Sequence, residues 1–173
     1  VHRDVARALK SEVALFAATW EKYHRAENDP FYDKTLTNPD AKIKEWLELA
    51  AQAVGCEPAR IAKTLSFKIG EEPILIVTAG DAKIDNHKYK EQFAVKAKML
   101  SPDEVAEKVG HTVGGVCPFG INEGVKVYLD ESMKRFATVF PACGSSNSAI
   151  ELTMEELEQC SGYEMWVDVC KLG

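Results

Sequence analysis

Several features that would narrow the function of this chain are missing from its sequence. No stretch approaches about eighteen consecutive apolar residues, so we expect no membrane-spanning helix. The five cysteines are odd in number and form no Cys-x-x-Cys pair, which signals neither a disulfide framework nor a zinc site. The four histidines show no metal-ligand spacing. We therefore expect reduced thiols, a cytoplasmic protein, and neither metal nor cofactor.

Positive charge is also scarce. The 21 Lys and Arg residues are outnumbered by 27 Asp and Glu residues, giving a net charge of −6. This balance argues against broad, non-specific affinity for nucleic acid, which needs many phosphate contacts. Several lysines nevertheless fall close together, and either a solvated surface or a local basic face would explain them: Lys83, Lys88, Lys90, Lys96 and Lys98.

The length of 173 residues, with 46% hydrophobic and 28% charged residues, fits one globular domain. Near the start, apolar residues recur at three- and four-residue steps, which predicts a long amphipathic helix. A polar connector runs to about residue 40, and Asn38 then predicts the N-cap of a second helix that Gly55 closes. The predicted apolar stripes are Val5, Leu9, Val13, Phe16, Trp20 and Tyr23, then Ile43, Trp46, Leu47, Ala50 and Val54.

Beyond residue 63 the apolar pattern changes to that of strands and short helices. Alternation over 65–69 predicts a half-buried strand, and the apolar run 74–77 predicts a central strand joined to it by a hairpin. Capping boxes predict helices beginning at Ser101 and Thr153. Further helical turns are expected at 87–93 and 130–132, and further strands at 125–129, 138–140, 150–152 and 165–169. These elements predict one α+β domain with a mixed sheet.

Lys63 is an unusual charge at the head of an apolar strand. Such a lysine can bury its stem and keep its ammonium in water. It can also hold a phosphate or carboxylate, or stabilise negative charge that develops on a carbonyl oxygen. Local sequence leaves both interpretations open.

Two loops could line a ligand pocket. Gly114 and Gly115 can adopt backbone angles closed to other residues and expose successive N–H groups to an oxyanion, and Pro118 stiffens the exit. The small, polar loop 144–148 lies between two predicted strands, where binding loops often occur. A plain structural turn remains the alternative for each.

Cys117 and His111 raise the alternative of a thiol hydrolase. No third orienting group can be named, and nothing in the sequence places the two side chains together. All five cysteines are more simply interpreted as small packing residues.

Five short motifs appear in an order that resembles one family. They are the segments 59–65, 78–81, 114–120, 127–132 and 142–147. This order is similar to that of the YbaK/EbsC family of aminoacyl-tRNA deacylases, relatives of the editing domain inserted in bacterial prolyl-tRNA synthetases. The resemblance covers about residues 47–170. It implies a YbaK-like fold, with a mixed sheet or open barrel flanked by helices, spanning 41–173. Residues 1–40 do not match the family pattern.

The resemblance also implies a function. It predicts a trans-editing enzyme that hydrolyses the ester between a wrong, small amino acid and the terminal adenosine of a tRNA, with no metal or cofactor. Mischarged tRNA and an aminoacyl-tRNA synthetase are the expected partners. Lys63 is implied as the active-site residue. The implied substrate-binding residues are Gly114, Gly115, Val116, Cys117, Pro118, Gly144, Ser145 and Asn147.

A second class of function remains open from the sequence. The chain could be a non-catalytic module that binds a tRNA acceptor end or a synthetase. Turnover of mischarged tRNA separates this alternative from the enzyme.

Overall fold

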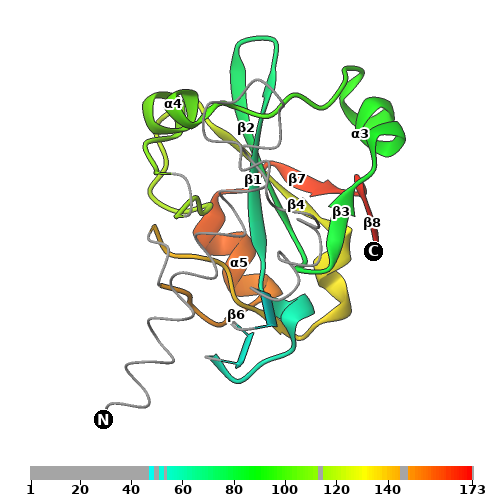
Figure 1. Cartoon of the computed structure of the whole chain (residues 1–173), viewed down its shortest axis with the longest axis vertical. Coiled ribbons are helices and arrows are strands. Elements are labelled where there is room, and N and C mark those ends of the chain that lie inside the picture. Colours follow the sequence, from blue (N-terminus) through cyan, green and yellow to red (C-terminus); the bar gives the residue numbers. More distant parts are fainter. Residues whose placement is uncertain (1–46, 49–50, 53, 113–114, 145–147, 173) are drawn as a thin grey trace, which may run out of the picture.

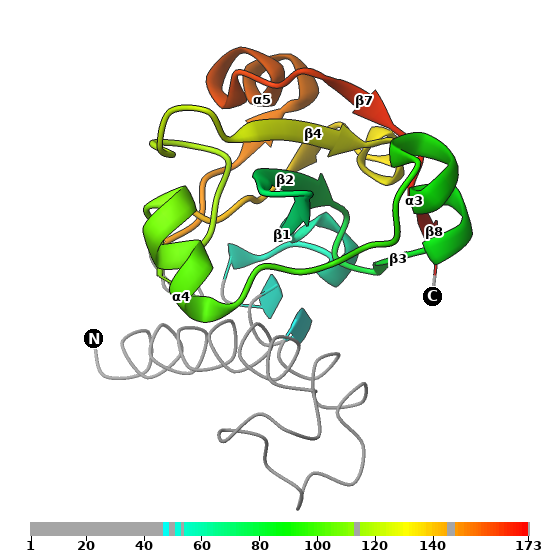
Figure 2. The ribbon, with the colours of Figure 1, turned by 90° about the horizontal axis from the view of Figure 1, so that it is seen from above.

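A mixed four-stranded sheet organises the chain in the computed structural model, which describes residues 47–48, 51–52, 54–112, 115–144 and 148–172. The first two strands form an antiparallel hairpin, and the next two add in parallel. Figure 2 views this strongly twisted sheet from above. Its strands in spatial order are β1 (Lys63–Ile69), β2 (Glu72–Thr78), β4 (Lys126–Asp130) and β7 (Met165–Val167).

The predicted hairpin and central strand are confirmed, but β1 is not half-buried. Leu65 and Phe67 are buried as expected, and so is Ser66, with none of its surface exposed. A further chain segment also runs along the outer edge of β1. The Lys68 N–H donates to the Lys98 carbonyl at 2.9 Å, and the Leu100 N–H donates to the Ser66 carbonyl at 3.1 Å. Both edges of β1 therefore carry backbone hydrogen bonds, one edge to β2 and the other to residues 98–100.

Two small antiparallel sheets flank the main one. They pair β3 (Ala82–Ile84) with β8 (Cys170–Leu172), and β5 (Thr138–Val139) with β6 (Leu152–Thr153). The sequence did not predict β3. The single strand expected over 165–169 is wrong, because the chain leaves the main sheet after Val167 and pairs again only at Cys170.

The helices begin and end largely where their capping residues predict. Ser101 and Thr153 both form complete capping boxes, and Gly110 ends its helix in the left-handed conformation with φ 84°. Figure 1 shows α3 and α4 at opposite sides of the sheet, with β3 and β8 near α3. The helical elements are η1 (Pro58–Arg60), α3 (Asn86–Phe93), α4 (Pro102–Glu104), η2 (Val105–Val109), η3 (Glu131–Arg135) and α5 (Met154–Ser161).

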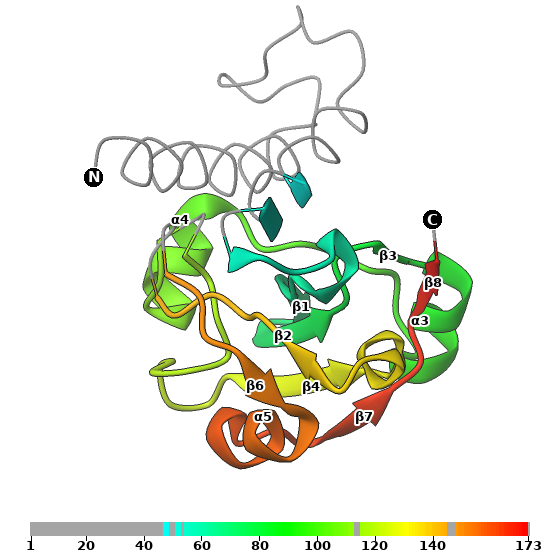
Figure 3. The same cartoon turned by 90° about the horizontal axis from the view of Figure 1, so that it is seen from below.

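Helix α5 lies beside β4 and β7 at the end of the sheet opposite to α4, as Figure 3 shows from below. The core between these layers includes Leu75, Ile76 and Val77 of β2, none of which has exposed surface. This continuous burial explains the apolar run in the sequence, since both faces of a central strand are covered. Tyr89 of α3 packs its ring 5.3 Å from that of Phe67.

The helix expected before Gly55 is described only in part. Leu47 is buried as predicted, whereas Val54 is 41% exposed, so its assignment to the buried stripe is wrong. Ala51, which the predicted stripe does not include, is also buried. Gly55 has φ 73°, as a left-handed cap requires. The other residues of that stripe, and residues 1–40, lie outside the described residues. No helix among the residues described is both long and apolar enough to cross a membrane.

The lowered pKa of Glu104 predicts how the stability of the protein depends on pH. Its hydrogen bond from Lys68, aided by the Ser101 N–H, lowers its pKa from 4.5 to about 2. A carboxyl whose pKa falls on folding stabilises the protein above its unfolded pKa and loses that contribution as pH drops through the folded value. We expect Glu104→Gln to lower the free energy of unfolding at pH 7, by an amount that shrinks between pH 4.5 and 2. Urea unfolding across pH measures this.

The matched control is Glu155→Gln, which changes an exposed residue in the first turn of α5. A stability difference between wild type and Glu104→Gln that stayed constant from pH 7 to pH 2 would contradict the prediction.

Candidate active site

Lys63 is the first residue of β1 and pairs with Thr78, the last residue of β2. Its side chain is partly buried, and its Nζ donates a hydrogen bond of 2.7 Å to the carbonyl of Ala82. An ammonium carries three N–H donors, and this contact uses one of them. The Lys63 ammonium is thus tied to the start of β3, which distinguishes it from a lysine that merely extends into water.

The turn between β2 and β3 is held in place by Gly80. A Cβ atom at this position would lie 2.2 Å from the Pro58 carbonyl oxygen and 2.8 Å from that of Ile61. The Gly80 N–H also donates to the Ala59 carbonyl at 2.9 Å. Only glycine fits against η1 at this distance, so the contact fixes the turn that carries Ala82.

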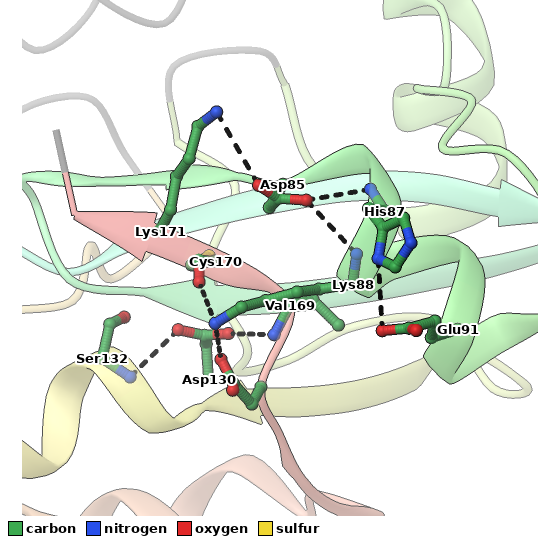
Figure 4. A network of polar contacts seen from close by, with 10 residues as sticks. Asp85, His87, Lys88, Glu91, Asp130, Ser132, Val169, Cys170 and Lys171 are labelled. Atoms are coloured by element: carbon green, nitrogen blue, oxygen red, sulfur yellow. Dashed lines mark hydrogen bonds and ion pairs between the residues drawn. The ribbon is translucent and has the colours of Figure 1, made fainter.

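Asp130 and Ser132 support the same turn from the other side. Asp130 is 1% exposed; its Oδ1 accepts the Ser132 N–H at 3.0 Å and its Oδ2 accepts the Val169 N–H at 2.9 Å. The Ser132 hydroxyl oxygen accepts the Ala79 N–H at 3.2 Å. Figure 4 shows the two contacts of Asp130, with Ser132 and with Val169, which join the end of β4 to the segment before β8. The segment 130–132 therefore has a structural role next to Lys63, and the bond to Val169 explains the break after β7.

The segment that leads to Gly144 runs beside the residues before Lys63. The Phe140 N–H donates to the Arg60 carbonyl at 2.8 Å, and the Ala62 N–H donates to the Phe140 carbonyl at 3.0 Å. The chain then passes from Phe140 to Gly144, which is exposed and has φ 81°. Of the pocket residues predicted in this loop, Ser145 and Asn147 lie outside the described residues.

The second predicted loop contacts the first. Gly115, Val116, Cys117 and Pro118 are all buried. Burial raises the pKa of the Cys117 thiol, and backbone groups of Phe119 and Gly144 oppose that shift by hydrogen bonding. The two loops therefore meet at Cys117 and Gly144. Gly114 lies outside the described residues.

The backbone donors of the glycine turn are largely used within the turn. The Gly115 N–H donates to the Thr112 carbonyl at 3.1 Å, and the Cys117 N–H donates to His111 Nδ1 at 3.3 Å. The expectation that Gly115 offers its N–H to an oxyanion is therefore wrong, because that group closes the turn itself. The N–H of Val116, the residue between Gly115 and Cys117, has no acceptor among the described residues.

Cys117 and His111 do come together, which the sequence did not indicate. Their Sγ and Nδ1 atoms lie 3.9 Å apart. The thiol also donates to the Phe119 carbonyl at 3.4 Å, and burial raises its pKa. A nucleophilic cysteine needs the opposite shift, towards thiolate. Cys117 is accordingly a packing residue, as predicted.

The same prediction fails for two other cysteines, since Cys143 and Cys160 are exposed. No cluster of three or more His, Cys, Asp or Glu side chains in the described part of the chain could hold a metal ion.

The chain belongs to the aminoacyl-tRNA editing domain family, whose model matches residues 41–160. It is 60% identical over 126 residues to the uncharacterized protein YwhH of Bacillus subtilis (strain 168), covering 72% of this chain and 80% of that protein. It is also 29% identical over 163 residues to a proline–tRNA ligase of Bacillus cytotoxicus. That match covers 94% of this chain but spans only 27% of the ligase.

A solved structure supports the same assignment. A protein proposed to be a trans-editing enzyme for prolyl tRNA synthetase matches with a TM-score of 0.66 and 31% sequence identity. The match covers 73% of this chain and 80% of that one. The YbaK-like α+β fold that the motifs implied is thereby confirmed.

The close approach of Gly80 to η1 yields a testable prediction. Gly80→Ala should destabilise the protein by about 1 to 3 kcal/mol, since the new methyl group overlaps two backbone carbonyls that cannot rotate away. Chemical denaturation measures the change.

Gly70→Ala is the control, because its Cβ would meet nothing within 4 Å and only its φ of 62° is unfavourable. It should cost about 1 kcal/mol. A loss well below about 1 kcal/mol for Gly80→Ala would show that the turn can move away from η1.

Proposed function

We propose that the chain is an aminoacyl-tRNA deacylase, which hydrolyses the ester joining a wrong, small amino acid to the 3′-terminal adenosine of a tRNA. Membership of the editing-domain family supports this class of substrate. The single observation that carries the proposal is the position of Lys63. Its ammonium is held by the Ala82 carbonyl at 2.7 Å, beside the segment that leads to the small-residue loop at Gly144.

The chemistry asks for positioning and charge more than for a strong nucleophile, because an aminoacyl ester is already reactive. A water molecule, alone or assisted by the neighbouring ribose 2′-hydroxyl, adds to the ester carbonyl. The bond to the ribose 3′-oxygen then breaks, that oxygen takes a proton, and the free amino acid and tRNA leave. In our proposal Lys63 binds the terminal nucleotide ester and stabilises the negative charge that develops on it.

The Val116 N–H is the backbone donor that we assign to the ester carbonyl. Its neighbours at Gly115 and Cys117 already donate within the turn, and a fixed donor costs no reorganisation during the reaction. Removing one comparable donor in other enzymes lowers the rate by about 10²- to 10³-fold. This assignment replaces the pair of glycine N–H groups expected from the sequence.

We propose a preference for a small amino acid because of the residues that would line the pocket. Gly115, Val116, Cys117 and Pro118 are small or medium-sized and buried, which leaves them little freedom to make room for a large side chain. We propose Gly144 as the facing wall, with Gly114, Ser145 and Asn147 completing the pocket. One methyl group in such a pocket changes binding by about 1 to 3 kcal/mol, so alanine, serine, threonine and cysteine are the candidates.

We further propose mischarged tRNA as the partner and the cytoplasm as the compartment. The five cysteines, all unpaired, suit a reducing environment. An aminoacyl-tRNA synthetase that supplies the mischarged tRNA is the second expected partner.

Mutation of Lys63 tests the proposal. With a panel of tRNAs mischarged with small amino acids, Lys63→Ala should lower kcat/KM for deacylation by about 10²-fold or more, since it removes a charge that stabilises the transition state. Circular dichroism and thermal melting should show a folded protein. Release of the labelled amino acid gives the rate.

Two control variants sharpen the result. Lys126→Ala removes another lysine from the sheet, one that pairs with Glu72 at 3.1 Å on the surface, and should keep wild-type activity. Cys117→Ser should also remain active, whereas a thiol hydrolase would lose its nucleophile. Wild-type rates in Lys63→Ala would refute our assignment. Binding of tRNA by the wild type without turnover of any mischarged tRNA would favour the non-catalytic module.

A further inference from the structure

An open hollow of about 570 Å³ lies close to the candidate site but does not include Lys63. This volume is within the usual range for small-molecule sites, roughly 300 to 1,000 Å³. The segment 55–60 forms one wall and the segment 135–138 the other. Two arginines line it, Arg60 and Arg135, together with one carboxylate, Glu57. The two arginines are the positive groups of this lining, and each also has a carboxylate partner, Glu151 for Arg60 and Asp81 for Arg135.

Both guanidinium groups are held in fixed orientations. Arg60 donates from Nε to the Thr138 carbonyl at 2.9 Å and lies 5.0 Å above the centre of the Phe140 ring. Arg135 donates from Nε to the Ser132 carbonyl at 2.8 Å and lies 4.8 Å above the Phe136 ring. Fixed planar donors bind anionic oxygens with little loss of side-chain entropy.

Each guanidinium retains N–H donors beyond those that its protein partners take. A guanidinium carries five N–H groups. Arg60 uses Nη2 for Glu151, at 2.7 Å, and for the Thr138 hydroxyl, so its Nη1 has no acceptor among the described residues. Arg135 donates once from each Nη to Asp81, which leaves one N–H on each nitrogen without a described partner. A phosphate oxygen can therefore add to these ion pairs without breaking them.

The turn from Ala79 to Ala82 connects the hollow with Lys63. Asp81 holds Arg135 on one side of this turn, and Ala82 accepts the Lys63 ammonium on the other. Gly80 packs against η1, whose last residue is Arg60. Both arginines and the active-site lysine are consequently built onto the same rigid turn.

We infer that this hollow binds a phosphodiester of the single-stranded 3′ end of the tRNA, next to the terminal adenosine whose ester lies at Lys63. This inference rests on the proposed function. Arginines are well suited to phosphate because their paired N–H groups match its oxygens. The hollow supplies a contact with the nucleotide chain that is independent of the amino acid, so it serves affinity for tRNA rather than choice of side chain.

Kinetics with two substrates test the inference. Arg135→Gln and Arg60→Gln should each lower kcat/KM for mischarged tRNA by roughly tenfold, the effect of losing one charged hydrogen bond. With 3′-aminoacyl-adenosine, which lacks the preceding nucleotides, the loss should be several-fold smaller. Lys134→Gln is the matched control: it removes a charge from the same element, η3, but lies outside the hollow and should match wild type on both substrates.

Glu151→Gln separates a binding role from a structural one. It frees Arg60 from its carboxylate partner, so it should strengthen binding of the uncharged trinucleotide CpCpA, followed by titration. Arg135→Gln should weaken that binding. Equal losses on both substrates, or CpCpA binding that neither variant changes, would overturn the inference. Because the titration needs no turnover, it decides the inference even if no mischarged tRNA is hydrolysed, an outcome that would count against the proposed function alone.

Discussion

The contact of Gly80 with the carbonyls of Pro58 and Ile61 is the constraint on which the rest of the site depends. It leaves no room for a side chain and presses the β2–β3 turn onto η1. That turn carries Ala82, whose carbonyl holds the Lys63 ammonium, and Asp81, whose carboxylate holds Arg135. This one contact thus helps to fix the positions of Lys63, Asp81 and Arg135, because in a close-packed interior a shift of one group displaces its neighbours.

The buried carboxylate of Asp130 completes the support. It accepts two backbone N–H groups, from Ser132 and Val169, while Ser132 holds the Ala79 N–H. Removing this buried carboxylate would leave two N–H donors unpaired, and that costs more free energy than the two bonds contribute when intact. The turn beside Lys63 is therefore held from two sides, as the proposed reaction, which relies on positioning, requires.

Elements set by local chemistry could be predicted from the sequence. The capping boxes at Ser101 and Thr153 fix helix starts through their own side chains, and the apolar run of β2 reflects burial on both faces. The pairing of β1 with residues 98–100 could not be predicted, because these partners are more than thirty residues away in sequence. Pairings that depend on such distant partners leave no local signal.

In the candidate site, too, residues with a local sequence signal could be predicted, whereas their partners could not. Lys63 could be singled out as a charge heading an apolar strand, and the order of motifs gave it a role. Its partner, the Ala82 carbonyl, could not be foreseen, because a backbone acceptor has no sequence signature and β3 was not predicted. The two arginines of the hollow likewise come together only through the folding of distant segments. The approach of His111 to Cys117 is local, but it depends on how the turn between them folds, which the residues alone do not specify.

The most direct test of the central claim is a crystal structure of the protein with a non-hydrolysable analogue of 3′-alanyl-adenosine, in which an amide replaces the ester. We expect Lys63 Nζ to contact the analogue while it keeps its bond to Ala82, and the Val116 N–H to face the amide carbonyl. An analogue bound elsewhere, or bound without contact to Lys63, would contradict it.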